Sequence, residues 1–194
     1  VDSGKVKDFP TALETVSQNV KLWLDASITD NVQVDTTDNN RIKTWFDLSG
    51  HQRHAINNDR YISDDNNEPY YVVNGINNKN VIKFFRTPYR SLRTVSFDTI
   101  SSPFTLFAVF NWYNQTYSGY LFNGNSSPSL YFSSPGIMQM SGGGSINSPP
   151  YTIGSSNYYY STLEFNNTNS GLYINGQKIP GSLNQTNFSR LHFG

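Results

Sequence analysis

The sequence predicts an all-β protein built as a sandwich of two antiparallel sheets. From residue 20 onward, short β-prone runs alternate with clusters of Gly, Pro, Asn and Ser, which is the spacing that a sandwich produces. Asn175-Gly176 lies between two such runs and predicts a two-residue β-hairpin. A helix signal occurs in one place only, near the N-terminus.

That helix signal comes first along the chain. Thr11 and Glu14 have the spacing of a capping box, Pro10 precedes them, and apolar residues follow at helical spacing. The pattern predicts a short helix over residues 11–18. We therefore interpret residues 1–20 as a helix and linker, and residues 21–194 as one sandwich domain.

The remaining elements are strands and the loops between them. Polar, Gly-rich stretches at residues 123–128, 141–145 and 167–171 predict connecting loops, the second of them exposed and flexible. The predicted strands cover residues 20–26, 41–47, 70–73, 80–85, 91–97, 103–112, 118–123, 129–133, 136–140, 157–165, 171–175 and 177–179.

Two tracts, at residues 22–27 and 44–50, share one pattern. Each places a Trp on a β-prone run, an Asp two residues later and a turn-prone Ser after that. We expect Asp25 and Asp47 to accept hydrogen bonds from backbone N–H groups where the strands end, which is a structural role.

The strand at residues 103–112 is apolar on both faces. Phe104, Leu106, Ala108 and Phe110 alternate on one face. We expect the other face, which carries Thr105, Phe107, Val109 and Asn111, to be largely buried as well.

These tracts together resemble the laminin-G-like, concanavalin-A-like superfamily. The two Trp-containing tracts are similar to the family's opening strands, and residues 74–84, 104–110 and 172–177 are similar to three later segments in the same order. The resemblance covers most of residues 20–194 and implies a two-sheet jelly roll. It implies no single activity, because this fold hosts lectins, adhesion modules, polysaccharide enzymes and structural domains.

The C-terminal segment raises an expectation of its own. Members of the family usually continue past a strand similar to residues 191–194 with a further strand that closes the sandwich. We therefore expect residues 21–194 to lack the closing strand. Two alternatives remain open: the sequence ends short of the domain, or another chain supplies the strand.

Composition narrows the classes of partner. Acidic and basic residues balance at 14 each and only 14% of residues are charged, so the basic stripe of a nucleic-acid binder is missing. No apolar run approaches the roughly 20 residues of a membrane span. Asn, Ser, Thr, Tyr and Gly are abundant, which favours neutral polar partners, carbohydrate above all. A loop-rich β architecture is the alternative explanation for the Asn excess.

The motifs of catalysis are missing. There is no Gly-x-Ser-x-Gly elbow, and no Glu-x-Asp-x-x-Glu tract of the laminarinase type. Acidic residues after residue 70 are limited to Asp98 and Glu164. His51 and His54 lie in a polar loop, where we expect solvent-exposed residues rather than a metal pair. We predict that the protein is not an enzyme.

Calcium is the more plausible metal, because it prefers carboxylate and carbonyl oxygens from loops. Residues 35–40 and 64–68 are two clusters that supply such ligands. Many laminin-G-like domains bind one Ca²⁺, so the resemblance implies at most one structural ion here, with no ligand transferred residue by residue.

Tyrosines in polar surroundings predict a ligand site. Sugar recognition needs flat aromatic faces beside amide groups, and Tyr is common where one end of the side chain is wet. The predicted glycan platform consists of Tyr113, Asn114, Tyr117, Tyr151, Asn157 and Tyr159. Packing at the rim of a sandwich is the alternative role for these tyrosines.

The functional hypothesis is a non-catalytic binding module for glycans or glycoproteins, or an adhesion module, within a larger secreted, cell-surface or virion protein. It predicts that the protein is extracellular or lies on a cell or virion surface. It also predicts that the protein does not bind nucleic acid and does not insert into a membrane. The alternative is a structural module that binds other subunits of a fibre, spike or capsid. The third and least favoured hypothesis is a polysaccharide-active enzyme.

Overall fold

The structure, a computed structural model, describes residues 18–38, 40–57, 67–85, 90–112, 118–125, 127–134, 136–151 and 158–194. Strands make up 52% of it and helical turns 5%, and its sheets are antiparallel, which confirms the predicted all-β class. The described residues contain no helix of seven or more residues. The helix predicted over residues 11–18 lies, apart from residue 18, outside the described residues. No helix of the described chain has the length and apolarity needed to cross a membrane.

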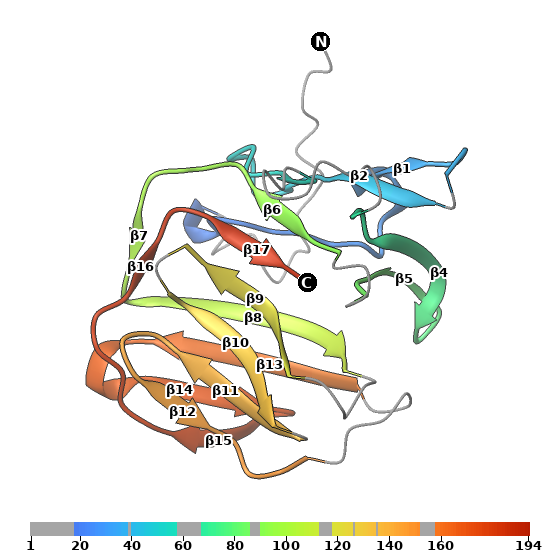
Figure 1. Cartoon of the computed structure of the whole chain (residues 1–194). Coiled ribbons are helices and arrows are strands. Elements are labelled where there is room, and N and C mark those ends of the chain that lie inside the picture. The colour runs from blue at the N-terminus through green and yellow to red at the C-terminus, as the bar shows by residue number, and fades with distance from the viewer. Residues whose placement is uncertain are drawn as a thin grey trace. The chain divides into compact units, whose positions relative to one another are not determined.

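The chain divides into two compact units, Val1–Ser96 and Phe97–Gly194. Figure 1 shows the first unit in blue to green and the second in green to red. The prediction of a single domain over residues 21–194 stays a prediction.

The first unit is built around β2. This strand pairs with β1 along its length, with β3 through two residues and with β4 through Arg41 and Tyr70. β3 also pairs with β6, and β4 with β5. The bounds are β1 (Val32–Asp35), β2 (Arg41–Trp45), β3 (Ala55–Ile56), β4 (Tyr70–Ile76), β5 (Lys79–Lys83) and β6 (Leu92–Thr94), with a 3-10 turn η2 (Thr29–Asn31) before β1.

The carboxylate of Asp47 organises the turn after β2. It accepts hydrogen bonds from the backbone N–H of Trp23 at 3.0 Å, of Ser49 at 2.9 Å and of Arg53 at 2.9 Å, and from the Ser49 hydroxyl at 2.8 Å. Asp25 accepts one such bond, from Ser27 N–H at 2.9 Å. The predicted structural role of both aspartates is confirmed.

The strand predicted over residues 20–26 is wrong. This stretch has a single β-bridge, between Leu24 and Asp47. The physical reason lies at Trp23, whose N–H donates to the side chain of Asp47 rather than to a neighbouring strand. A side-chain acceptor has taken the donor that a sheet ladder would have used.

Two hairpins show how Asn enables tight turns. β14 (Gly171–Ile174) and β15 (Gln177–Pro180) are joined by Asn175 and Gly176, with φ of 51° and 82°, so the predicted two-residue hairpin is confirmed. β4 and β5 are joined in the same way by Asn77 and Asn78, with φ of 46° and 59°. Positive φ at both central positions matches the right-handed twist of the flanking strands.

The second unit contains two main sheets and one short ladder. The first sheet has the order β15-β14-β13-β8, the second the order β12-β11-β10-β9-β17, and β7 pairs with β16. The bounds are β7 (Ile100–Ser101), β8 (Phe104–Asn111), β9 (Gly119–Gly124), β10 (Ser129–Ser134), β11 (Ile137–Ser141), β12 (Ser145–Asn147), β13 (Tyr158–Phe165), β14 (Gly171–Ile174), β15 (Gln177–Pro180), β16 (Asn187–Phe188) and β17 (Leu191–Phe193). A second 3-10 turn, η3 (Asn167–Asn169), joins β13 to β14.

Aromatic rings join the inner faces of these two sheets. Phe110 of β8 contacts Phe132 of β10 edge-on, with ring centroids 6.0 Å apart. Trp112 stacks on Phe132 at 4.1 Å, and Tyr159 of β13 stacks on Phe110 at 5.7 Å. The unit is therefore sandwich-like, and further fully buried side chains fill its core: Leu130, Met138, Met140, Leu163, Phe165, Leu172 and Ile174.

The outward face of β8 differs from its prediction. Phe107 and Val109 are 79% and 73% exposed, although we expected this face to be largely buried. The prediction was wrong because a two-layer sandwich covers only one face of each sheet. In this unit the face of β8 that carries Phe104, Leu106, Ala108 and Phe110 is turned to the second sheet, and Phe107 and Val109 point the other way.

Candidate functional site

Charge is distributed very unevenly along the chain. Residues 1–96 carry 12 of the 14 acidic and 12 of the 14 basic residues, and residues 99–163 contain no Asp, Glu, Lys, Arg or His. Strands β8 to β12 fall entirely within this uncharged stretch. Any ligand site on these strands has only neutral groups with which to bind.

A β-bulge turns Tyr120 to the surface. The β9–β10 register runs from Phe122 opposite Leu130 to Tyr120 opposite Tyr131, so Leu121 has no partner. Strict alternation would have placed Tyr120 on the buried face beside Phe122. The bulge instead brings Tyr120, which is 44% exposed, next to Tyr131, with ring centroids 4.7 Å apart and planes at 44°. Re-aiming a side chain is a common role of bulges.

These two tyrosines begin a row that crosses four strands. Tyr131 lies opposite Tyr120 on one side and Gln139 on the other, and Gln139 lies opposite Asn147. We call Tyr120, Tyr131, Gln139 and Asn147 the tyrosine–amide row. With strands about 4.8 Å apart, the row is about 14 Å long.

The amide end of the row keeps hydrogen-bonding capacity for a ligand. Gln139 Nε2 donates to Asn147 Oδ1 at 2.9 Å. This bond fixes both side chains and does not use Gln139 Oε1, an acceptor, or Asn147 Nδ2, a donor. The row thus presents two aromatic faces followed by oriented amide groups.

A second row lies two residues further along β10, β11 and β12, and three residues further along β9 because of the bulge. It consists of Asn123, Ser129, Ser141 and Ser145, which are successive partners in the ladders. Ser129 is only 5% exposed, so Asn123, Ser141 and Ser145 are the members that reach the surface. Since side chains on one face recur every two residues, these amide and hydroxyl groups flank the tyrosine–amide row. On β9 to β12 this face carries no Asp, Glu, Lys, Arg or His and is rich in groups that hydrogen-bond to hydroxyls, and His192 of the neighbouring β17 lies opposite Asn123.

The outer face of the other sheet has a different chemistry. Phe107 and Val109 of β8 lie beside Tyr160 and Tyr158 of β13, because Val109 pairs with Tyr160 and Asn111 with Tyr158. All four side chains are more than a third exposed. We call them the β8 surface; exposed apolar clusters of this kind mark interaction sites.

A small charged group lies on the outer face of the same sheet. The Tyr173 hydroxyl donates to Glu164 Oε2 at 3.0 Å, and Lys178 Nζ lies 5.3 Å from the Tyr173 ring centroid. A hydrogen bond with Tyr173, and to a smaller degree the charge of Glu164, raises the pKa of Lys178 above its ordinary value. Glu164 is therefore engaged with a tyrosine, and it is one of only two acidic residues of the second unit.

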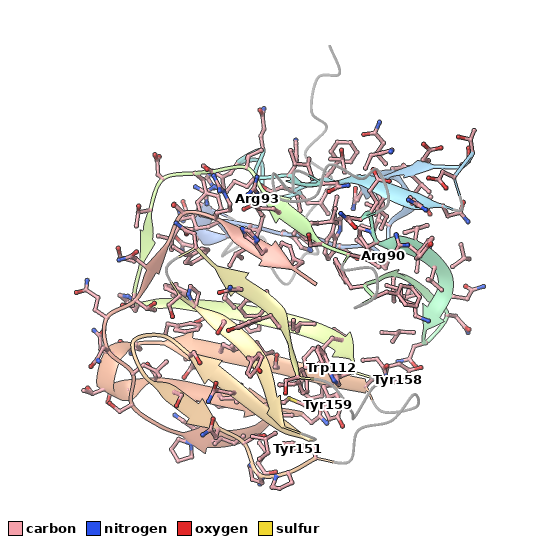
Figure 2. The ribbon with its side chains drawn as sticks, viewed as in Figure 1. Arg90, Arg93, Trp112, Tyr151, Tyr158 and Tyr159 are labelled. Carbon is pink, nitrogen blue, oxygen red and sulfur yellow. The ribbon has the colours of Figure 1, made fainter. Side chains whose placement is uncertain are left out.

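Two residues of the predicted glycan platform fall in the described chain. Figure 2 labels Trp112 after the end of β8, Tyr158 and Tyr159 at the start of β13, and Tyr151 below them in the same unit. Tyr159 is only 4% exposed and its ring stacks on Phe110, so it offers no face to a surface ligand. Tyr151 is half-buried and packs edge-on against Tyr159 at 5.9 Å. The other four, Tyr113, Asn114, Tyr117 and Asn157, lie outside the described residues.

The predicted calcium ligands fit an ion poorly where they are described. Asp35 Oδ1 accepts bonds from the N–H and hydroxyl of Thr37, and Lys43 Nζ lies 3.9 Å from Asp35 Oδ2. Asp38 is 3.2 Å from Arg41 Nε. Both carboxylates thus already have cationic neighbours. Asn39 and residues 64–66 lie outside the described chain, and among described residues no three His, Cys, Asp or Glu gather around one point.

The two histidines also have separate roles. His54 Nδ1 accepts a hydrogen bond from Asp47 N–H at 3.0 Å, and its ring packs edge-on against Phe46 at 5.2 Å. His51 is exposed, as expected for a polar loop. His54 belongs to the turn around Asp47 and is half-buried rather than solvent-exposed.

Arg90, labelled in Figure 2, belongs to a buried polar group of the first unit. Its guanidinium donates to the Glu68 carbonyl and to the Tyr70 hydroxyl, and lies 4.4 Å from the Tyr70 ring centroid. The buried carboxylate of Glu68 pairs with Lys43 at 2.7 Å. These groups join β2 to β4, which is a structural role.

No protein-family model and no curated protein matches this sequence. The candidate site is therefore defined by its own residues. Sequence reasoning missed Tyr120 because a bulge cannot be read from alternation. Gln139 did leave a signal: one amide between Met138 and Met140 indicates an outward position on a buried strand.

Proposed function

We propose that this chain is a non-catalytic carbohydrate-recognition or adhesion module, of the laminin-G-like, concanavalin-A-like jelly-roll type. It would belong to a larger secreted, cell-surface or virion protein. The observation that carries the proposal is the tyrosine–amide row on the outer face of β9–β12.

The chemistry of the row suits a neutral sugar. Pyranose rings have apolar C–H faces that stack on aromatic side chains, and equatorial hydroxyls that pair with amides at the edge. Tyr120 and Tyr131 supply the rings, and Gln139 and Asn147 supply the amides. The uncharged stretch at residues 99–163 gives no counter-charge for an anionic ligand.

The number and placement of the acidic residues in the second unit fit a binding role better than glycoside hydrolysis. Glycosidases need two carboxyl groups that flank the scissile bond. The second unit has two acidic residues in its sequence, Asp98 and Glu164. Glu164 accepts a hydrogen bond from Tyr173 on the other sheet, away from the tyrosine–amide row.

A glycan array, followed by calorimetry on the bound glycans with and without Ca²⁺, tests the proposal. We expect Tyr120→Ala and Tyr131→Ala each to weaken binding by about 10-fold or more, since desolvated aromatic residues dominate such contacts. Tyr160→Ala is the matched control, because Tyr160 is an exposed tyrosine on the other sheet. Unchanged affinity in the Tyr120 and Tyr131 variants, or no bound glycan at all, would contradict the proposal.

The β8 surface favours a second candidate function, assembly with a second copy of the chain. Among the described strands of its sheet, β8 pairs with β13 alone and so forms an edge. Edges are usually protected by charge, proline or a bulge. β8 has none of these: its register with β13 is regular over eight pairs and its sequence is uncharged.

The sequence of β8 suits antiparallel pairing with itself. If two copies pair about Ala108, Phe107 of each lies opposite Val109 of the other on the outward face, an aromatic to β-branched pair of the stabilising kind. The two Ala108 Cα atoms would then be about 5 Å apart, within disulfide range.

A cysteine cross-link tests this second function, since the protein has no cysteine. We expect oxidised Ala108→Cys to form a covalent dimer. Thr105→Cys is the control, because in this register the two copies of residue 105 are far apart. A wild-type protein that sediments as a monomer, with no cross-linking of Ala108→Cys, would exclude self-pairing through β8.

A further inference from the structure

We infer that the ligand of the tyrosine–amide row is a linear, neutral oligosaccharide that runs across strands β9 to β12 and contacts about three successive sugar rings. The inference rests on the proposed carbohydrate function and adds the form, charge and direction of the ligand.

The direction follows from the ladder register. Tyr120, Tyr131, Gln139 and Asn147 are successive partners on adjacent strands, so the row is perpendicular to the strand direction. A chain lying along a strand would meet only one member of the row. A chain lying across the strands meets all four.

The length follows from the strand spacing. Three intervals of about 4.8 Å give a row of about 14 Å, which is the length of about three linked pyranose rings. The tyrosine pair, with centroids 4.7 Å apart, fits one sugar at its end of the row. The Gln139–Asn147 pair lies at the opposite end and contacts the sugars beyond it.

The flanking row argues for an unbranched chain. The flanking row, Asn123, Ser129, Ser141 and Ser145, runs beside the tyrosine–amide row, two residues or about 7 Å away along β10, β11 and β12 and three residues away on the bulged β9. The amide of Asn123 and the hydroxyls of Ser141 and Ser145 are placed to meet the outward hydroxyls of the same chain, whereas Ser129 is buried. A bulky branch at this position would lie over these side chains.

Neutrality follows from composition. Strands β9 to β12 carry no Lys, Arg or His, and the nearest such residue in the sheet is His192 of β17, opposite Asn123 of the flanking row and not in the tyrosine–amide row. A uronic acid, sulfate or sialic acid placed there would lose hydration without gaining an ion pair. Neutral hexose or pentose chains avoid this cost.

The test uses neutral linear homo-oligosaccharides of one to six residues from the gluco-, xylo-, manno- and chito- series, measured by calorimetry. For the series that binds, we expect affinity to rise with length up to three or four residues and then to level off. We expect Tyr131→Ala to weaken binding of every length by about 10-fold or more. Gln139→Ala should weaken the trisaccharide and leave the disaccharide within about 2-fold.

Backbone amide NMR supplies a readout that does not depend on variants. On titration with the trisaccharide, shifts should appear on all four strands, at Tyr120, Tyr131, Gln139 and Asn147. Attaching a nitroxide to the reducing end should broaden one end of the row far more than the other.

The outcomes separate the two claims. Shifts confined to β9 and β10, or an equal effect of Gln139→Ala on di- and trisaccharide, would overturn the cross-strand chain and leave carbohydrate recognition standing. Binding only of charged or branched glycans through Tyr120 and Tyr131 would also overturn the inference alone. Failure of every glycan to bind would overturn both.

Discussion

The two units of this chain are stabilised by different chemistry. In the first unit, charged side chains satisfy backbone groups: the Asp47 carboxylate accepts four hydrogen bonds, and Arg90 donates to a carbonyl and a tyrosine. In the second unit, rings from both sheets contact one another, stacked or edge-on, in a continuous series through Phe110 and Phe132. The distribution of charge along the sequence has the same boundary, with 12 of the 14 acids and 12 of the 14 bases in residues 1–96.

This difference has a functional consequence. Because aromatic packing stabilises the second unit internally, its outer faces need no ion pairs to support the fold. They carry the neutral tyrosine–amide row and the apolar β8 surface, with one small charged group made by Glu164, Tyr173 and Lys178. In the first unit, the buried carboxylate of Asp47 and the buried guanidinium of Arg90 are engaged in structural hydrogen bonds.

The largest expected effect is at the centre of the aromatic series. Phe132 is 1% exposed and contacts Trp112 and Phe110, so Phe132→Ala should lower the free energy of unfolding by about 4 kcal/mol. Urea denaturation measures the change. Phe107→Ala, at a residue 79% exposed, is the control and should stay within about 0.5 kcal/mol. Equal effects of the two substitutions would show that aromatic burial does not stabilise this unit.

The next effect tests the first unit. Asp47→Ala removes the acceptor of four hydrogen bonds and leaves the N–H groups of Trp23, Ser49 and Arg53 without it, so we expect a loss of about 3 kcal/mol. Asp25→Ala, which removes one bond at a more exposed site, should cost about 1 kcal/mol. Hydrogen exchange of these amides localises the effect. A change in Asp47→Ala no larger than in Asp25→Ala would contradict the role assigned to Asp47.

A smaller effect is expected at Arg90. Arg90→Ala removes bonds to the Glu68 carbonyl and the Tyr70 hydroxyl and a cation–π contact, and should cost about 2 kcal/mol. Arg90→Lys keeps the charge but not the planar group that reaches both acceptors, so it should recover only part of that loss. Full recovery with Lys would show that charge alone matters. Thermal unfolding of the two variants distinguishes these outcomes.

Features that depend on contacts between residues near one another in the sequence could be predicted, and features that depend on the pairing of distant strands could not. The Asn175-Gly176 hairpin and the hydrogen bonds that Asp25 accepts from Ser27 and Asp47 accepts from Ser49 depend on residues close in sequence, and these roles were predicted. The Trp23 N–H that also donates to Asp47 is 24 residues away, and that partner was not predicted. The outward orientation of Tyr120 depends on a bulge in β9 opposite β10. The exposure of Phe107 depends on which face of its sheet packs against the core. Both are properties of strands brought together by folding, so no local pattern in the sequence contains them.

The smallest effects concern pH, and they have opposite signs in the two units. Hydrogen bonds from the Thr37 hydroxyl and N–H hold the pKa of Asp35 below its ordinary value of 3.8, with a further contribution from Lys43. A folded-state pKa below the unfolded value means that the stabilisation is present above about pH 4 and is lost as pH falls through the folded-state pKa. Thr37→Val should return the pKa of Asp35 towards 3.8, as measured by carboxyl-carbon NMR.

Lys178 is the corresponding group in the second unit. Its pKa is raised from 10.5, first by the hydrogen bond with Tyr173. Its contribution is therefore complete below the unfolded pKa and is lost as pH rises through the folded-state pKa. Tyr173→Phe should lower the pKa of Lys178, while Thr37→Val leaves it unchanged. An unchanged pKa of Lys178 in Tyr173→Phe would show that the hydrogen bond with Tyr173 is not what raises this pKa. The pH dependence predicted for the second unit would then be contradicted.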